Sequence, residues 1–147
     1  MFPMQSIGLV RSPYTETAQI PGGPGVQHHA EGVLDILPEF EEGLTDLEGF
    51  SHLFVLWIFD RAAGYDLLVT PPTATRPHGV FATRAPRRPN PIGLTVVQLL
   101  GREGPRLHVR GIDMLDGSPI LDLKPYLSSV SAEHLKRGWL AEAEARR

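Results

Sequence analysis

The sequence contains no cysteine, and this absence removes several classes of chemistry at once. Disulfides, thiolate metal sites and a cysteine nucleophile are excluded, and such a chain is compatible with a reducing compartment. Long hydrophobic runs are also missing, since the longest, residues 53–59, is far too short to span a bilayer. Residues 1–14 lack the basic segment, apolar run and cleavage site of a secretory signal. We therefore expect a soluble, cytoplasmic protein with no membrane contact.

Several motifs that indicate catalysis or cofactor binding are absent from the sequence as well. The histidines are scattered, and a zinc site needs several convergent ligands, so we expect no metal. His28 and His29 are adjacent and would point to opposite faces of a strand. The glycine-rich residues 22–25 have neither the spacing nor the following helix of a dinucleotide-binding motif. No GxSxG nucleophile motif is present.

A strong charge of either sign is missing from the chain as a whole, whose formal net charge is −3. Such a protein does not coat nucleic acid indiscriminately. Acidic residues are nevertheless absent from residues 67–102, a stretch that contains His78 and several arginines: Arg76, Arg84, Arg87, Arg88 and Arg102. One basic segment in an acidic protein suits a defined anionic ligand, such as a phosphate, a carboxylate or a short reach of RNA backbone.

Within this segment, residues 79–94 read GVFATRAPRRPNPIGL and contain Pro86, Pro89 and Pro91. Proline fixes φ and removes a backbone donor, so the stretch is neither a helix interior nor a central strand. It predicts a stiff, irregular loop between a short strand and a longer one. A stiff loop holds a functional arginine where its ligand binds, and we place the function here. The alternative is a surface loop with solvated arginines.

The remaining chain is typical of short strands with little helix between them. The continuous apolar run over residues 52–59 predicts a strand buried on both faces, at the centre of the sheet. Residues 95–100 and 106–112 predict a hairpin with a turn at 101–104. Further strands are expected at residues 6–10, 30–37, 67–70 and 120–123. These elements predict a mainly β, antiparallel sheet curled into a single barrel, with one domain over residues 1–147 and its core within residues 6–127.

Three helical segments are expected around this sheet. Pro38 opens one or two helical turns at an allowed early position. Thr45 is placed to cap a second short helix, with Glu48 in capping-box spacing. Ser131 is placed to cap a C-terminal helix over residues 131–147, with an apolar face of Leu135, Trp139 and Leu140.

Acidic residues return after the predicted hairpin as Asp113, Asp116 and Asp122. Carboxylates at strand ends can accept ribose hydroxyls or lie near a cation. The alternative is turn chemistry, with Asp116 in an Asx-type turn and the other two solvated or paired with Lys124. The residues leave both readings open.

Four blocks of the sequence resemble one family, the TsaA-like/TrmO family. The blocks are IGLVRSPY, PEFEEGLTDLEGFSHLFVLWIFDRA, PHGVFATRAPRRPNPIGLT and GIDMLDGSPILDLKPYL, and they cover most of residues 7–127. The resemblance implies an open antiparallel β-barrel that dimerises with its cofactor near the interface. It further implies S-adenosylmethionine-dependent methyl transfer to the exocyclic amino group of threonylcarbamoyl-adenosine beside the anticodon of tRNA.

The resemblance also implies roles for individual residues. Cofactor contacts fall on Arg84, Leu94, Asp113, Asp116, Gly117 and Ser118. Substrate contacts fall on His52, Arg88 and Asn90, and the basic segment adds Arg76 and Arg87 as further candidates for substrate binding. No general base is evident, and proximity in sequence makes Asp60, Asp113 and Asp116 the candidates.

The chain departs from the family pattern in places. Residues 20–25 (IPGGPG) stand where many members have an arginine-containing segment, and Asp60 stands where histidine is frequent. The chain is also expected to lack the extra C-terminal domain of longer bacterial members. The altered segment favours an alternative function, a non-catalytic barrel that binds S-adenosylmethionine or RNA. The net charge of −3 suits another, a methyltransferase for small molecules.

Overall fold

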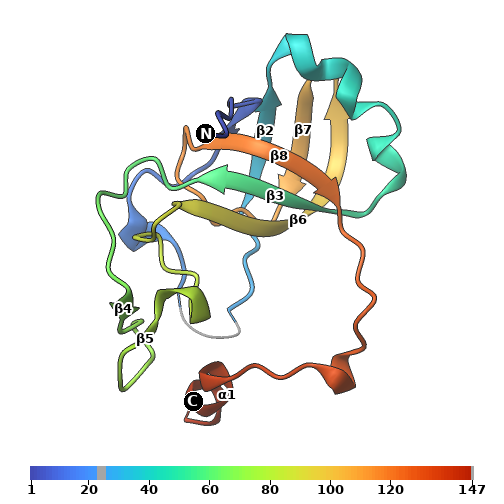
Figure 1. Cartoon of the computed structure of the whole chain (residues 1–147). Helices are drawn as coiled ribbons and strands as arrows, with labels where there is room; N and C mark the ends of the chain where they lie inside the picture. Colours follow the sequence, from blue (N-terminus) through green and yellow to red (C-terminus); the bar gives the residue numbers. More distant parts are fainter. Residues whose placement is uncertain (23–25, 147) are drawn as a thin grey trace.

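The computed structural model describes residues 1–22 and 26–146. Six antiparallel strands pair in the order β1-β2-β7-β6-β3-β8 and close into a barrel (Figure 1). The remaining two strands, β4 and β5, form a separate hairpin outside it. The mainly β fold is therefore confirmed. The bounds are β1 Gly8–Arg11, β2 Glu31–Ile36, β3 His52–Ile58, β4 Leu68–Val69, β5 His78–Gly79, β6 Ile92–Glu103, β7 Arg106–Arg110 and β8 Pro119–Pro125.

The ring depends on strands that serve two neighbours. Strand β6 pairs with β3 through its first half and with β7 from Gln98 onward, and a bulge lies between Leu99 and Gly101 within the pairing with β7. A bulge bends a strand and increases its twist, which helps a sheet to close. Strand β1 completes the ring by pairing with both β2 and β8. The open barrel implied by the resemblance is corrected here to a closed one.

The structure corrects the environment predicted for residues 52–59. Strand β3 is buried on one face only, through Leu53, Val55 and Trp57, while the intervening side chains are exposed or partly exposed. The strand pairs with both β6 and β8, so it is interior to the sheet, but a barrel has one inner and one outer face. The apolar run therefore supplies the core and also an apolar outer surface.

The core lies inside the barrel and follows the alternation of its strands. Its members are Val10, Leu34, Ile36, Leu44, Leu53, Val55, Trp57, Val97, Leu107, Val109, Ile112, Met114 and Ile120. In β6 and β7 every second side chain points inward over much of the pairing, as the polar–apolar pattern predicts.

Two local predictions near the strand ends are wrong in detail. Strand β6 continues through Glu103, because residues expected in the turn pair with β7, and the chain turns at Gly104 and Pro105. Thr45 does not cap the 3-10 helix Leu47–Gly49; its hydroxyl donates to Glu42 O and closes the preceding 3-10 helix, Pro38–Leu44. The remaining 3-10 helices are Thr17–Gln19, Val80–Ala82 and Ala132–His134.

The predicted helix over residues 131–147 is much shorter in the structure. Residues after β8 extend away from the barrel, and the helix α1 occupies only Trp139–Ala145 (Figure 1). Leu135 lies outside it and is 58% exposed, whereas Ala143 is buried. Gly138, with φ of +56°, precedes the helix and breaks the longer one. Among the described helices, none is long and apolar enough to cross a membrane.

Candidate functional site

Residues 83–91, here called the arginine loop, connect the 3-10 helix Val80–Ala82 to β6. The Thr83 hydroxyl donates to Val80 O at 2.8 Å, and Arg88 Nη1 donates to Thr83 O at 2.8 Å and to Ala85 O at 3.3 Å. These bonds and the prolines make residues 83–91 an irregular, internally braced loop. Arg88 is thus a brace of the loop. The loop predicted over residues 79–94 is too long, because residues 80–82 form a 3-10 helix and β6 already begins at Ile92.

The arginine loop forms one wall of a cavity of about 450 Å³. This volume lies within the range typical of small-molecule sites. The other walls come from the end of β3, the start of β6 and the segment before β8. Lining residues are Trp57, Phe59, Thr83, Arg84, Arg88, Asn90, Ile92, Gly93, Leu94 and Asp113.

A chain of two hydrogen bonds, the first of them buried, holds the carboxylate in this cavity. Trp57 Nε1 donates to Thr95 Oγ1 at 3.0 Å, and Thr95 Oγ1 donates to Asp113 Oδ1 at 2.6 Å. Burial raises the pKa of Asp113, although the Thr95 hydrogen bond and the positive charges of His28 and Arg84 partly offset this. Within the described chain, Asp113 Oδ2 has no hydrogen-bond partner. A carboxylate with one fixed oxygen and a raised pKa is suited to accept a proton.

Arg84 is the cation available to a ligand in this cavity. Its side chain is exposed, and no hydrogen bond or ion pair ties it to any residue within 1–22 and 26–146. By contrast, Arg87 donates to Asp66 at 2.9 Å and to Ala63 O at 3.0 Å. A free guanidinium can bind a carboxylate or a phosphate through two parallel hydrogen bonds.

Gly93 brings the backbone of β6 against the indole of Trp57. A Cβ at this position would lie 2.3 Å from Trp57 Cε2, so no other residue fits without displacing the ring. The ring of Trp57 packs against Phe59 with centroids 4.2 Å apart. The cavity therefore has an aromatic wall whose position depends on a glycine.

Three of the predicted cofactor residues have structural contacts elsewhere. Asp116 Oδ1 accepts the Ser12 amide at 3.0 Å, and the Asp116 amide donates to Tyr14 O at 2.7 Å. Gly117 N donates to Val10 O at 2.8 Å, with φ of +85°. Ser118 is buried and its hydroxyl donates to Leu115 O. These groups attach the turn before β8 to β1 and are not among the residues that line the cavity. Asp122 pairs with Lys124 at 3.1 Å, as the turn-chemistry reading expected.

The other predicted residues also lie apart from the cavity lining. His52 is at the opposite end of β3 from Trp57, where Ser51 Oγ lies 2.8 Å from its Nδ1. Asp60 is 3.8 Å from Arg61 Nε. Arg76 faces Glu142 at 3.8 Å. Of the predicted set, the cavity brings together Arg84, Arg88, Asn90, Leu94 and Asp113.

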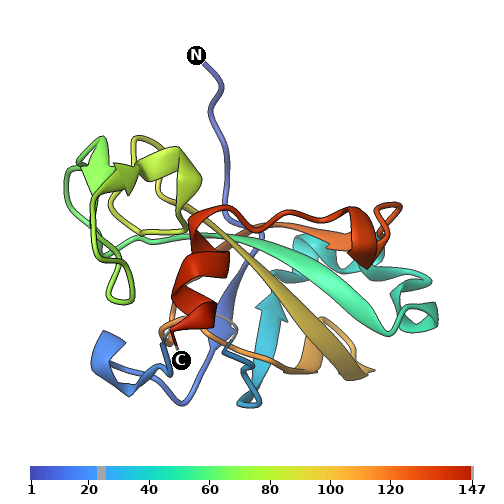
Figure 2. The ribbon, with the colours of Figure 1, turned by 90° about the horizontal axis from the view of Figure 1, so that it is seen from below.

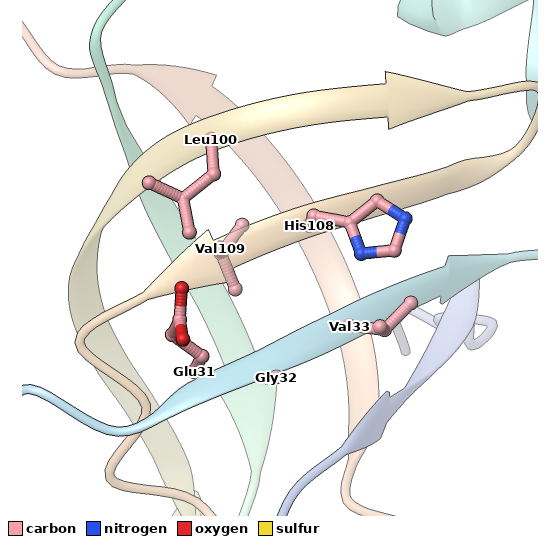
Figure 3. A pocket seen from close by; sticks show the side chains of 6 residues that line it. All are labelled: Glu31, Gly32, Val33, Leu100, His108 and Val109. Carbon is pink, nitrogen blue, oxygen red and sulfur yellow. The ribbon is translucent and has the colours of Figure 1, made fainter.

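A second hollow, of about 300 Å³, lies over β2, β6 and β7 (Figure 3). Its lining is Glu31, Gly32, Val33, Leu100, His108 and Val109. Glu31 is paired there with Arg110 at 3.3 Å. It contains none of the predicted site residues, and the arginine-loop cavity is the better candidate.

Sequence reasoning missed the residues that organise the cavity. The strand predictions include Trp57 and Thr95 only as members of residues 52–59 and 95–100, with no role in a site. Gly93 carried a usable signal, because a glycine inside a strand indicates close approach of another group. The bond from Thr95 to Asp113 joins residues 18 positions apart and has no local signature.

Comparison with known proteins assigns this chain to a protein family. The model of the tRNA-methyltransferase O N-terminal domain family matches residues 9–132. The chain therefore belongs to this family, which confirms the resemblance seen in the sequence.

Individual relatives give the same assignment. A probable S-adenosyl-L-methionine-binding protein of Archaeoglobus fulgidus is 49% identical over 142 residues, which cover 95% of this chain and 38% of the relative. A tRNA (adenine(37)-N6)-methyltransferase of Escherichia coli is 37% identical and is matched over 86% of this chain and 58% of its own length. The crystal structure of TrmO from Pseudomonas aeruginosa superimposes with a TM-score of 0.76 at 39% identity, covering 94% of this chain and 62% of that one. The chain thus spans only 38 to 62% of these relatives.

Proposed function

We propose that this protein is a cytoplasmic, S-adenosylmethionine-dependent methyltransferase. Its proposed acceptor is the N6 nitrogen of an adenosine beside the tRNA anticodon, in the threonylcarbamoyl-modified form that the family resemblance implies. The observation that carries the proposal is the convergence in one cavity of an arginine that pairs with none of the described residues, a partly buried carboxylate and an aromatic wall. Membership of the family and the names of the relatives support the choice of cofactor and substrate.

The cavity residues fit this cofactor. Arg84 would hold its carboxylate, and the wall of Trp57, Phe59 and Leu94 would cover its apolar parts. When bound, S-adenosylmethionine supplies a methyl group attached to a positively charged sulfur. Because the cofactor supplies the reactive carbon, the protein must provide position, exclusion of water and a proton acceptor.

Among the three candidate bases, Asp113 has the suitable environment. Its Oδ2 would accept the proton that the adenine amino nitrogen loses as the new N–C bond forms. Thr95 and Trp57 fix the carboxylate through Oδ1, so Oδ2 is held in place for this step. The carboxylate of Asp116 is engaged by the Ser12 amide, and Asp60 does not line the cavity.

Cofactor binding is the first test of this proposal. We expect one S-adenosylmethionine per chain by titration calorimetry. At a hundredfold excess over Kd, binding stabilises the fold by about 2.7 kcal/mol, which raises Tm by roughly 5–10 °C for a chain of this size. Absence of both heat and a thermal shift up to millimolar cofactor would contradict the proposal.

The acceptor is tested with a tritiated methyl group on three substrates: fully modified tRNA, tRNA without modifications, and a metabolite pool. Transfer to modified tRNA alone supports the proposal. Transfer to small molecules would favour the small-molecule methyltransferase. Cofactor binding without any transfer would favour a non-catalytic binding barrel.

We also propose that two copies of the chain associate through the outer face of β3 and β6. Antiparallel pairing places apolar residues directly opposite one another there, as Phe54–Val96, Leu56–Leu94 and Ile58–Ile92. Ile92, Leu94 and Val96 are 40–42% exposed. On the neighbouring β8, Lys124 and Asp122 bound the patch. Contiguous exposed apolar patches are typical of interaction sites, and twofold dimers are the commonest soluble oligomers.

The same patch reaches the cavity, because Ile92 and Leu94 belong to both. A second copy would therefore shield the cavity from water. We expect Val96→Glu to change the mass measured by light scattering from that of a dimer to 16.2 kDa, the mass of one chain. Val130→Glu is the matched control, since Val130 is 53% exposed but lies beyond β8. A parent that already scatters as one chain at micromolar concentration would exclude this dimer.

A further inference from the structure

The C-terminal helix α1 is attached to the segment that leads into the arginine loop. The indole of Trp139, its first residue, stacks on the imidazole of His78 with centroids 4.5 Å apart and planes 12° apart. Trp139 Nε1 also donates to Ala82 O at 2.8 Å. In both views α1 lies on the same side of the barrel as the β4–β5 hairpin, reached by the extended chain after β8 (Figures 1 and 2).

The helix makes further contacts along the same segment. Arg146 Nη2 donates to Thr73 O at 3.0 Å, and Glu142 faces Arg76 at 3.8 Å. Ala143 and His78 are buried in this contact region, each with less than a tenth of its surface exposed. The exposed ion pair contributes little, whereas the stack on the buried His78 and the indole hydrogen bond to Ala82 fix the helix on residues 78–82.

The Trp139 contact lies next to the site. The carbonyl of Ala82 accepts a hydrogen bond from the indole N–H. The next residue is Thr83, whose carbonyl accepts a hydrogen bond from Arg88. Thr83 and Arg84 then line the cavity. The family model ends at residue 132, so α1 and residues 133–138 before it lie outside the matched region.

From these contacts we propose that Trp139 is a positioning residue that fixes the start of the arginine loop and so sets the affinity of the site for its cofactor. The cofactor part of this inference rests on the proposed function. Without the indole, Ala82 loses its hydrogen bond and His78 loses its packing partner. The loop then samples positions in which Arg84 is not directed at the ligand, and this reduces the fraction of binding-competent protein.

The test compares Trp139→Ala, Trp139→Phe and the control Leu135→Ala, whose parent side chain is 58% exposed in the same segment. We expect Trp139→Ala to raise the Kd for S-adenosylmethionine about tenfold, the effect of losing one hydrogen bond and one aromatic contact. Trp139→Phe keeps the stack but lacks the N–H, so its Kd should lie between those of Trp139→Ala and the parent. Leu135→Ala should bind like the parent.

Amide hydrogen exchange separates this inference from the proposed function. In Trp139→Ala the amides of Thr83 and Ala85, which donate to Val80 O and Thr83 Oγ1, should exchange faster than in the parent, while the amides of β6 and β7 should not. This measurement needs no cofactor, so failure of the parent to bind S-adenosylmethionine overturns only the proposed function. Unchanged exchange at both amides in Trp139→Ala and in Trp139→Phe would overturn the positioning role. A uniform loss of protection over the whole barrel would also overturn it. If the parent binds S-adenosylmethionine, an equal Kd for Trp139→Ala and the parent would overturn it as well.

Discussion

Asp113→Asn is expected to lose most methyl-transfer activity while the protein remains at least as stable as the parent at neutral pH. Asparagine keeps an oxygen that can accept the hydrogen bond from the Thr95 hydroxyl. In place of Oδ2 it has an NH2 group, which cannot accept a proton. Loss of a general base typically costs about 10²–10⁴-fold in rate. The measurement is tritiated-methyl transfer at saturating cofactor, and a variant within threefold of the parent would remove Asp113 from this role.

Stability provides the second readout for this variant. Burial raises the pKa of Asp113, so the folded protein binds the proton more tightly than the unfolded chain does. The cost of the buried charge is absent below the unfolded pKa, near 3.9, grows as pH rises toward the raised folded value, and is complete above it. We therefore expect the Tm of Asp113→Asn to match that of the parent near pH 3 and to exceed it at neutral pH. The opposite trend would mean that the carboxylate stabilises the fold.

Arg84→Lys is expected to weaken cofactor binding about ten- to a hundredfold. Lysine keeps the charge but loses the planar fork, and a lost charge-assisted hydrogen bond costs about 1.5–3 kcal/mol. No described residue pairs with Arg84, so no internal contact is lost and Tm should not change. The matched control is Arg106→Lys, because Arg106 is 64% exposed on β7, 3.9 Å from Asp35. Equal affinity of the Arg84 variant and the parent in calorimetry would place the cofactor carboxylate elsewhere.

Features governed by local chemistry were predictable from the sequence. Alternating side chains gave the strands around residues 31–36 and 106–110, and prolines gave the irregular arginine loop. Local reasoning failed where the outcome depended on partners far along the chain. Residues 52–58 read as buried on both faces because apolar periodicity cannot distinguish a sheet covered on two sides from a barrel wall with an apolar exterior. Thr45 read as a helix cap because its spacing to Glu48 did not reveal the closer acceptor, Glu42 O.

The candidate site likewise has features that the sequence predicts and features that only the tertiary structure sets. The residue types and spacing in the sequence were enough to indicate the family, the basic segment and Arg84 as a candidate site residue. Which carboxylate enters the cavity was decided only by the tertiary structure. Asp113 and Asp116 are three residues apart, yet one bonds Thr95 in the cavity and the other bonds Ser12 beside β1. Contacts of this kind form between segments that the closed ring brings together, and neither residue type nor local periodicity encodes which segments those are.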